Sequence, residues 1–474
     1  MLFNTYTFFA FLAVVLCVYY LPLAWWFKKA FLLVVSYLFY AAWNPPLVVI
    51  LWLCTILDWY FAKAMHRIQQ QTWRRVVLVG SLIMNLGLLG FFKYGGFAVE
   101  NFLALTHQLG WDLQLARPDI ILPVGISFYT FQSLTYTIDV YRRKGPPWHS
   151  FLDYALYVTF FPPLLAGPIV RAFDFLPQCM APRRATGKQF AWGLCLVAIG
   201  IFEKNVLADG VLAPVVEMVY EAQGDPGFVS AWTGTLAFAG QIFCDFSGYS
   251  VCAIGIAMCM GFYLPDNFRF PYAAIGFSDF WKRWHISLSG WLRDYLYISL
   301  GGNRRGVSRT YSNLMVTMLL GGLWHGASWT FVIWGGLHGL YLVAERLIKR
   351  VVPAAKVWHY RPVKLLLGLM TFALVCVAWV FFRARTFSRA AAVVTAMLGW
   401  QRSPTAMPVG ANYVAEALVV VAAILGFHWV MRDISLEQLA HRCPWWLRSV
   451  VLAAILICLM MLSGEERAFI YFQF

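Results

Sequence analysis

The sequence predicts an all-α protein that crosses a membrane many times. Hydrophobic residues make up 61% of the 474 residues and charged residues only 12%, whereas an ordinary soluble domain has about 45–50% and about 25%. Apolar windows of about 20 residues, enough for a helix to cross a hydrocarbon core of roughly 30 Å, recur from end to end. No long polar stretch separates them. We therefore expect one integral-membrane domain over residues 1–474.

Basic residues place the ends of several spans in the cytoplasm, because Lys and Arg are enriched in cytoplasmic loops. Lys28 and Lys29 follow the first apolar stretch, and Arg142, Arg143 and Lys144 follow the fifth. The stretches predicted to span the membrane are 4–27, 30–43, 46–64, 76–95, 119–140, 190–215, 229–262, 364–382, 412–431 and 448–463. With the segments described next, the expected total is about eleven to thirteen membrane helices.

The segment 151–170 differs from an ordinary spanning helix. It contains Pro162, Pro163, Gly167 and Pro168, and basic residues stand on both sides of it. Two cytoplasmic flanks favour a re-entrant segment, whose broken backbone is tolerated only where protein or a cavity shelters it. A kinked spanning helix is the alternative.

Residues 264–310 form a basic loop that is predicted to be cytoplasmic, with seven Lys and Arg against three Asp. At about 100° per residue, the aromatic side chains of its middle part share one face, Lys282 and Arg293 share another, and His285 lies between the two. The apolar face consists of Trp281, Trp284, Leu288, Trp291 and Tyr295. This pattern predicts an amphipathic helix at the membrane surface.

Residues 311–345 carry a histidine deep in an apolar run, and the run ends in basic residues that are again cytoplasmic. The segment must therefore go out and return, or dip into the membrane. Intramembrane ionisable residues are costly and are functional candidates by default. A neutral imidazole, with a reference pKa near 6.5, suits a general base, so His325 is the first catalytic candidate. A hydrogen bond between helices is the alternative role. His338 need not share its pocket.

Charged and polar residues suggest further sites. Lys and Arg are the usual partners of phosphate groups, so the basic loop is a candidate site for an acyl donor such as coenzyme A, with lipid headgroups as the alternative. The candidate donor-binding residues are Lys282, Arg283, Arg293, Arg304, Arg305 and Trp324. Asp245 lies inside the run 229–262 and needs a partner there, either as structural glue or as part of a site.

Other classes of site receive less support. The net charge is +15, but the positive-inside bias and anionic lipid explain it without a nucleic-acid partner. The ten cysteines form no CxxC pair and lie mostly in apolar runs, which favours buried thiols over disulfides or metal ligands. No metal site is predicted.

Several motifs, in order along the chain, resemble the membrane-bound O-acyltransferase family, and within it the bacterial polysaccharide O-acetyltransferases of the alginate or cellulose type. The motifs are Phe280–Ser289, Trp291–Tyr297, Gly301–Arg304 and Leu323–Ala327, supported by Leu122–Tyr129, Ala166–Ile169 with Arg171, and Asp245–Ser250. The resemblance is strong over residues 120–345, the expected core. The flanking helices, within 1–115 and 360–463, match by hydropathy alone.

The resemblance implies a fold and an activity. His325 matches the family's catalytic histidine and His285 its second histidine, within a ring of tilted helices and re-entrant segments around a funnel. The implied reaction moves acetyl from cytoplasmic acetyl-coenzyme A, without a permanently bound cofactor, through the bacterial inner membrane. A periplasmic acetyltransferase or esterase-like partner would then modify an exported polysaccharide. Val251 stands where this branch often has a second Asp.

Three alternatives remain open at this point. Many spans, broken helices and a buried histidine also describe a transporter or flippase, and an export scaffold would share the composition. Within the enzyme class, peptidoglycan or teichoic acid is an alternative acceptor. The aromatic C-terminal end, Phe469–Phe474, is expected to dock either on a partner or on the chain itself.

Overall fold

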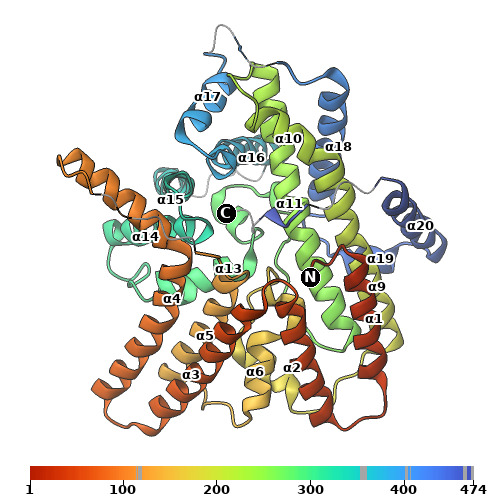
Figure 1. Cartoon of the computed structure of the whole chain (residues 1–474). Coiled ribbons are helices and arrows are strands. Elements are labelled where there is room, and N and C mark those ends of the chain that lie inside the picture. The colour runs from red at the N-terminus through yellow and green to blue at the C-terminus, as the bar shows by residue number, and fades with distance from the viewer. Residues whose placement is uncertain are drawn as a thin grey trace. The chain divides into compact units, whose positions relative to one another are not determined.

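The computed structural model describes residues 1–113, 115, 120–352, 360–400, 404–405, 407–462 and 467–470. All regular elements in this part of the chain are helices (Figure 1), so the predicted all-α class is confirmed. The chain divides into two compact units: unit 1 comprises Met1–Leu194 and Ala253–Pro265, and unit 2 comprises Cys195–Cys252 and Asp266–Phe474. The single-domain organisation and the ring around a funnel stay predictions.

Unit 1 contains the first eight helices and the start of the ninth. They are α1 (Tyr6–Tyr20), α2 (Trp25–Ala41), α3 (Val48–Arg67), α4 (Gln71–Gln108), α5 (Ile126–Tyr141), α6 (Phe151–Thr159), α7 (Phe161–Leu164), α8 (Ala172–Phe175) and α9 (Gly187–Ile201). Short 3₁₀ turns lie between these helices, at Pro45–Leu47 before α3 and at Leu176–Cys179 after α8.

Unit 2 begins within α9 and contains the remaining helices, except that the end of the helix Phe228–Cys259, from Ala253 onward, belongs to unit 1. They are a π-helical segment (Phe202–Leu212), α10 (Ala213–Tyr220), α11 (Phe228–Cys259), a 3₁₀ turn (Pro271–Ala273), α12 (Phe277–Trp281), α13 (Ile286–Trp291), a second π-helical segment (Leu292–Tyr297), α14 (Val307–His325), α15 (Trp329–Val351), α16 (Arg361–Arg383), α17 (Phe387–Met397), α18 (Ala411–Val430), α19 (Leu436–Arg442) and α20 (Trp445–Met461).

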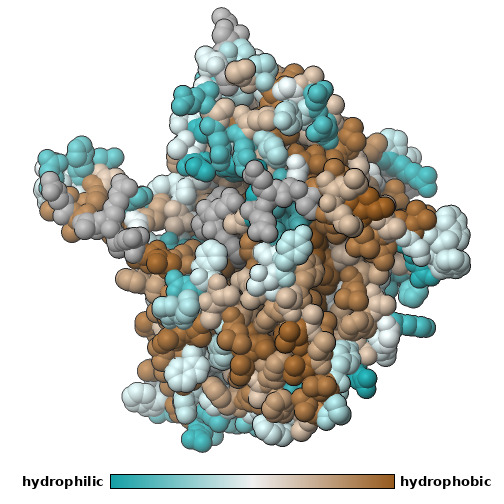
Figure 2. Space-filling view, turned by 45° about the vertical axis from the view of Figure 1, so that its right-hand side comes forward, coloured by the Kyte–Doolittle hydropathy of each residue, from teal (hydrophilic) through white to brown (hydrophobic). Residues whose placement is uncertain are grey.

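The described part of the chain is that of a multi-pass membrane protein. Seven of its helical segments are long and apolar enough to cross a bilayer: Pro45–Arg67, Gln71–Gln108, Gly187–Tyr220, Phe228–Cys259, Trp329–Val351, Arg361–Arg383 and Ala411–Val430. Broad areas of exposed apolar side chains accompany them (Figure 2), as expected of a lipid-facing surface. Seven is fewer than the predicted eleven to thirteen, because the sequence interpretation also counted stretches that form shorter helices.

The first predicted span shows this difference. Residues 4–27 do not form one helix: α1 ends at Tyr20, the chain bends, and α2 begins at Trp25. Lys28 and Lys29 therefore lie near the start of α2 and not in a loop. Lys29 forms an ion pair with the buried carboxylate of Asp153, so a positive charge that marked a helix end in the sequence instead joins two segments of unit 1.

The segment 151–170 is broken, as the re-entrant interpretation predicts. Helix α6 has nine residues and α7 has four, and neither can cross a bilayer at 1.5 Å per residue. Every residue from Asp153 to Val170 is buried. Protein surrounds the broken backbone, as a re-entrant segment requires, and this favours the re-entrant interpretation over a kinked spanning helix.

The predicted amphipathic helix over residues 281–295 is wrong. The chain there forms α12, a turn, α13 and a π-helical segment, and the turn is made by His285 in the left-handed conformation, with φ +43°. His285, Trp284 and Leu288 are all fully buried. The helical-wheel argument failed because it assumed a regular helix, whereas the buried contacts of His285 break the helix at that residue.

Helices α14 and α15 form an antiparallel hairpin. Of the two, only α15 is long and apolar enough to count among the candidate spans, so the two predicted paths of residues 311–345, out and back or a dip into the membrane, stay predictions. Glycines permit the close crossing. A Cβ atom on Gly335 would lie 2.2 Å from the carbonyl oxygen of Met318, and one on Gly322 would lie 2.3 Å from that of Phe331. Small residues at such a crossing are the usual means of close helix packing in membranes. The hairpin holds His325 at the end of its first helix.

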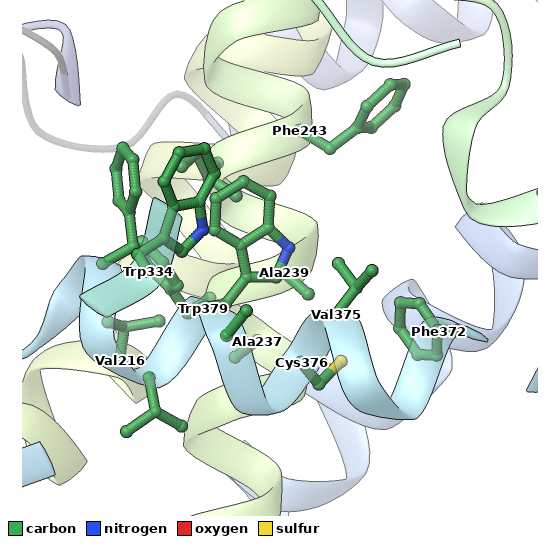
Figure 3. Close-up of a cluster of buried hydrophobic side chains, with 14 of the residues drawn as sticks. Val216, Ala237, Ala239, Phe243, Trp334, Phe372, Val375, Cys376 and Trp379 are labelled. Atoms are coloured by element: carbon green, nitrogen blue, oxygen red, sulfur yellow. The ribbon is translucent and has the colours of Figure 1, made fainter. Parts of the chain in front are cut away.

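The hydrophobic core of unit 2 packs against this hairpin. Figure 3 shows Trp334 of α15 beside Trp379 of α16, with their ring centroids 5.8 Å apart and nearly stacked. Side chains of α10, α11 and α16 continue the cluster, which includes Val216, Ala237, Ala239, Phe243, Phe372, Val375 and Cys376. All of these are buried, so the core fixes one side of the catalytic candidates described next.

Candidate active site

His285 is fully buried at the turn between α12 and α13. Its Nδ1 atom lies 3.0 Å from Oδ1 of Asn267, a buried residue of the preceding loop. The ring of Phe246, from α11, meets the imidazole edge to face at 4.6 Å. Because no water reaches the ring, burial lowers the pKa of His285 to about 3, which keeps the imidazole neutral at physiological pH.

His325 is the last residue of α14 and is 3% exposed. Three aromatic rings surround it at centroid distances of about 5 Å: Trp324 at 4.9 Å, Trp334 at 4.9 Å and Phe382 at 5.4 Å. The next residue must be glycine, because a Cβ on Gly326 would lie 2.1 Å from the ring of Phe331. The Leu-Trp-His-Gly motif therefore ends the helix and fixes the imidazole in an aromatic cage.

The structure brings the two predicted histidines together. Their ring centroids are 6.4 Å apart, and Trp324 contacts both rings, at 6.0 Å from His285. They come from motifs 40 positions apart, so only the fold could show this proximity. Trp324, predicted as a donor-binding residue, thus belongs to the histidine pair. Two buried imidazoles this close are chemically suited to proton transfer and to acyl transfer.

His338 lies near the pair but does not contact it. It is fully buried in α15 and stacks on Phe280 at 5.7 Å, and Trp334 separates its ring from that of His325. This agrees with the expectation that His338 need not share the pocket of His325.

The predicted cationic residues fall into two groups. Arg283 is only 11% exposed, because its guanidinium binds the carboxylate of Asp279 and the carbonyl of Arg432; it holds α12 against the end of α18. Lys282, Arg293, Arg304 and Arg305 are exposed, although Arg293 also pairs with Asp294. The exposed cations just before α14 are therefore the better candidates for binding phosphate groups.

Asp245 has the partner that a membrane carboxylate requires. Nζ of Lys204, in the π-helical segment, lies 2.5 Å from Oδ1 of Asp245 and 3.0 Å from Oδ1 of Asp209. All three side chains are at most 12% exposed. Sequence reasoning missed Lys204 and Asp209, although both stand inside the predicted span 190–215, where charges are a signal of function. π-Helical segments are frequent at functional sites.

These charges form the floor of a polar pocket of about 470 Å³. Its lining consists of Lys204, Asp209, Glu217, Glu221, Gln241, Asp245, Arg383, Arg385, Arg467, Ala468 and Ile470. Two pocket residues are sequence neighbours of residues that contact the histidines: Asp245 precedes Phe246, which contacts His285, and Arg383 follows Phe382, which contacts His325. The histidines themselves do not belong to the pocket lining.

The C-terminal end packs on the chain itself as far as the structure describes it. The backbone N–H of Ile470 donates to Oδ2 of Asp245 at 2.7 Å, and Phe469 packs 5.7 Å from Phe246. Arg467 forms an ion pair with Glu217. Of the two expectations for this end, docking on the chain itself is confirmed for residues 467–470. Tyr471–Phe474 lie outside the described residues.

An ion pair at the pocket rim predicts a pH dependence. Hydrogen bonding to Arg383 lowers the pKa of Glu221 below 4.5, and Arg385 binds the same oxygen. A lowered carboxyl pKa stabilises the fold above pH 4.5 and loses that contribution as the pH falls through the lowered pKa. Because Glu221 is 42% exposed, the pair contributes at most about 1 kcal/mol. We expect Glu221→Gln to lower the thermal midpoint slightly at pH 7, with a gap that closes as the pH falls below 4.5 and through the lowered pKa. A gap that widens on acidification would contradict this.

Comparison with known proteins identifies the family of the chain that carries the two histidines. The model of the membrane-bound O-acyltransferase family matches residues 147–388, a range that contains both histidines and the pocket floor. The chain belongs to the membrane-bound O-acyltransferase family. The resemblance found in the sequence is thereby confirmed, and the protein is an acyltransferase.

Relatives of this acyltransferase align over most of its length. A probable alginate O-acetylase of Azotobacter vinelandii is 41% identical, covering 83% of this chain and 77% of that protein. A probable alginate O-acetylase of Pseudomonas aeruginosa is 39% identical, over 92% and 82%. A peptidoglycan O-acetyltransferase of Helicobacter pylori is 38% identical, over 84% and 80%. These relatives thus include proteins named for two different acceptors.

Proposed function

We propose that this acyltransferase moves acetyl groups from cytoplasmic acetyl-coenzyme A through the bacterial inner membrane, for O-acetylation of an exported polysaccharide of the alginate or cellulose type. One observation carries the proposal: two buried histidines within the range that the family model matches lie with their ring centroids 6.4 Å apart. The exposed Arg304 and Arg305 precede α14, the helix that ends at His325, and a separate polar pocket is lined by residues of the same unit. We assign the acyl donor to the arginines and the acceptor to the pocket.

The donor side fits an anionic, phosphate-bearing thioester. Lys282, Arg304 and Arg305 are exposed, and guanidinium groups bind phosphates with paired hydrogen bonds. Phosphates held at the loop would let the uncharged pantetheine arm enter the apolar interior. The thioester would then lie against His325, with Trp324 and Trp334 excluding water.

The acceptor side fits a hydroxyl-bearing molecule. Four carboxylates and four cationic groups line the pocket, so its charges balance, and each has hydrogen-bonding capacity for hydroxyl groups. We propose that a periplasmic acetyltransferase or esterase-like partner accepts the acetyl group here and passes it to the polymer. The support is the pocket's chemistry and the names of the alginate relatives.

The reaction balances with these residues. His325 takes the proton from the accepting hydroxyl as its oxygen bonds to the thioester carbon. The carbon–sulfur bond breaks, and the coenzyme A thiolate takes up that proton from the imidazolium. Alternatively, His325 first carries the acetyl group itself, which is chemically allowed. No permanently bound cofactor is required in either route.

Replacing both loop arginines tests the donor side. We expect Arg304→Gln/Arg305→Gln to raise KM for acetyl-coenzyme A at least about tenfold, because each hydrogen bond to a charged group contributes about 1.5–3 kcal/mol, while kcat changes little. KM for acetyl-pantetheine, which lacks the phosphates, should stay unchanged. Arg309→Gln, an exposed arginine of the adjacent first turn of α14, is the matched control. Equal KM values for both donors in all variants would indicate a lipid-binding role instead.

The acceptor can be tested in cells. In a strain that lacks its own polysaccharide acetylase, this protein and its genomic neighbours should restore O-acetyl groups on the exported polymer and leave peptidoglycan acetylation unchanged. Acetylated peptidoglycan with an unmodified polymer would shift the acceptor to that of the Helicobacter pylori relative. If neither the polymer nor the peptidoglycan becomes acetylated, the proposal is contradicted.

A further inference from the structure

The backbone of His285 is held in a conformation that few side chains adopt. Its φ of +43° lies in the left-handed region, and strained residues of this kind persist only where their surroundings hold them, often at active sites. Asn267 makes hydrogen bonds that stabilise this conformation of His285. Its backbone carbonyl accepts the N–H of Ile286 at 2.9 Å, and its side-chain oxygen lies 3.0 Å from Nδ1 of His285.

The hydrogen bonds around Asn267 determine which way its amide faces. The backbone N–H of Ser287 lies 3.4 Å from Oδ1 and can only donate. The hydroxyl of Ser287 donates to the same oxygen at 2.9 Å, while Nδ2 donates to Oγ of Ser250, on α11, at 3.1 Å. The atom that faces His285 is therefore the amide oxygen. Because an amide oxygen only accepts, Nδ1 of His285 must carry the hydrogen.

We propose that Asn267 is a positioning residue that fixes His285 in the Nδ1–H tautomer, so that Nε2 offers its lone pair to an N–H group of the pantetheine arm beside His325. The inference rests on the proposed function for the identity of the acyl donor. It adds a role for His285, which holds the acyl donor by accepting a hydrogen bond from it. His325 takes the proton of the hydroxyl group that receives the acetyl group.

The surroundings of His285 keep it in this role. The groups packed on its ring are Phe246 of α11, Phe268 of the preceding loop, and Trp324 and His325 of α14. His325 is the titratable group that faces it. Burial, which lowers the pKa of His285 to about 3, favours the neutral ring, and a neutral ring with Nδ1–H can only accept at Nε2.

Two variants separate tautomer control from mere packing. Asn267→Leu keeps the volume but removes the acceptor, and it should raise KM about tenfold for both acetyl-coenzyme A and acetyl-pantetheine, the loss expected for one hydrogen bond. Asn267→Asp keeps an acceptor but adds a charge that favours imidazolium. It should match wild type at alkaline pH, with KM rising as the pH falls below the raised pKa of His285, because the protonated ring can no longer accept.

The control variant is Asn85→Leu, which removes another buried amide, one that binds Asp58 in unit 1. It should lower stability without changing KM or its pH dependence. The inference is overturned if both Asn267 variants keep wild-type KM values, or if both lose activity equally at every pH while folded. If Asn267→Leu does not fold, the dependence of KM on pH in Asn267→Asp tests the inference instead.

A spectroscopic measurement decides the inference even if the protein transfers no acetyl group. In protein labelled with ¹⁵N-histidine and reconstituted in lipid, the two nitrogen shifts of His285, assigned by their loss in His285→Asn, report its tautomer. The inference is supported if His285 is in the Nδ1–H form in wild type and if the Asn267→Leu variant shows a mixture of the two tautomers or mainly the Nε2–H form. The Nε2–H form in wild type overturns it. Absence of acetyl transfer by wild type would count against the proposed function alone.

Discussion

Replacing His325 with alanine is expected to lower polysaccharide O-acetylation in cells by about 10²–10⁴-fold, the usual effect of removing a general base. The imidazole is buried at the end of α14, within an aromatic cage and 6.4 Å from the ring of His285. The three rings that form the cage, those of Trp324, Trp334 and Phe382, carry no group that takes a proton at neutral pH, and we assign the nearby His285 to binding of the donor. The acetyl content of the secreted polymer is the measurement, normalised to the amount of protein in the membrane.

A matched histidine controls for the loss of any buried imidazole. His428 of α18 is 1% exposed, and its Nδ1 accepts the backbone N–H of Tyr272. We expect His428→Ala to lower the amount of folded protein while each remaining molecule stays active. Acetylation per molecule that falls equally in both variants would remove the special role of His325.

The second large effect is expected at the crossing of α14 and α15. The Cβ of Gly335→Ala would lie 2.2 Å from the carbonyl oxygen of Met318 and 3.1 Å from Cα of Gly322. Both are backbone atoms, so the helices must separate and His325 must move. Overpacking typically costs about 1–3 kcal/mol, and occasionally more, so we expect little folded protein and at least a tenfold loss of acetylation per molecule.

The neighbouring glycine provides the control for this effect. A Cβ on Gly336 would meet only Cδ2 of Leu319, at an ordinary 3.5 Å. Gly336→Ala should therefore be neutral or slightly stabilising, because alanine favours a helix by up to about 1 kcal/mol over glycine. Thermal midpoints in detergent compare the two variants. If Gly335→Ala is as stable and active as Gly336→Ala, the hairpin does not position His325.

The catalytic candidates were predictable because burial of an ionisable group leaves a mark in the sequence. His325 stands in an apolar run, and Asp245 stands in another; each is costly unless it has a partner or a function. The break in residues 151–170 was predictable for a similar reason, since prolines and a glycine interrupt an otherwise apolar stretch. These inferences depend on local composition alone.

Other parts of the site depend on long-range contacts that no local pattern reveals. Asn267 looks like an ordinary loop residue, and its role follows only from the backbone turn that brings it to His285. The same turn invalidated the helical wheel over residues 281–295. Arg283 looked like its exposed neighbours, yet Asp279 and the end of α18 occupy its guanidinium. Charge predicts a direction for the membrane helices, but it does not reveal which cations are available to a ligand.

The most direct test of the account is the release of free coenzyme A from acetyl-coenzyme A by the purified protein in nanodiscs, with and without its periplasmic partner. The account predicts release by wild type in the presence of the partner, and loss of that release in His325→Ala. Release that persists in His325→Ala would remove that residue from the reaction. Absence of release from wild type with the partner present would contradict acetyl-coenzyme A as the donor.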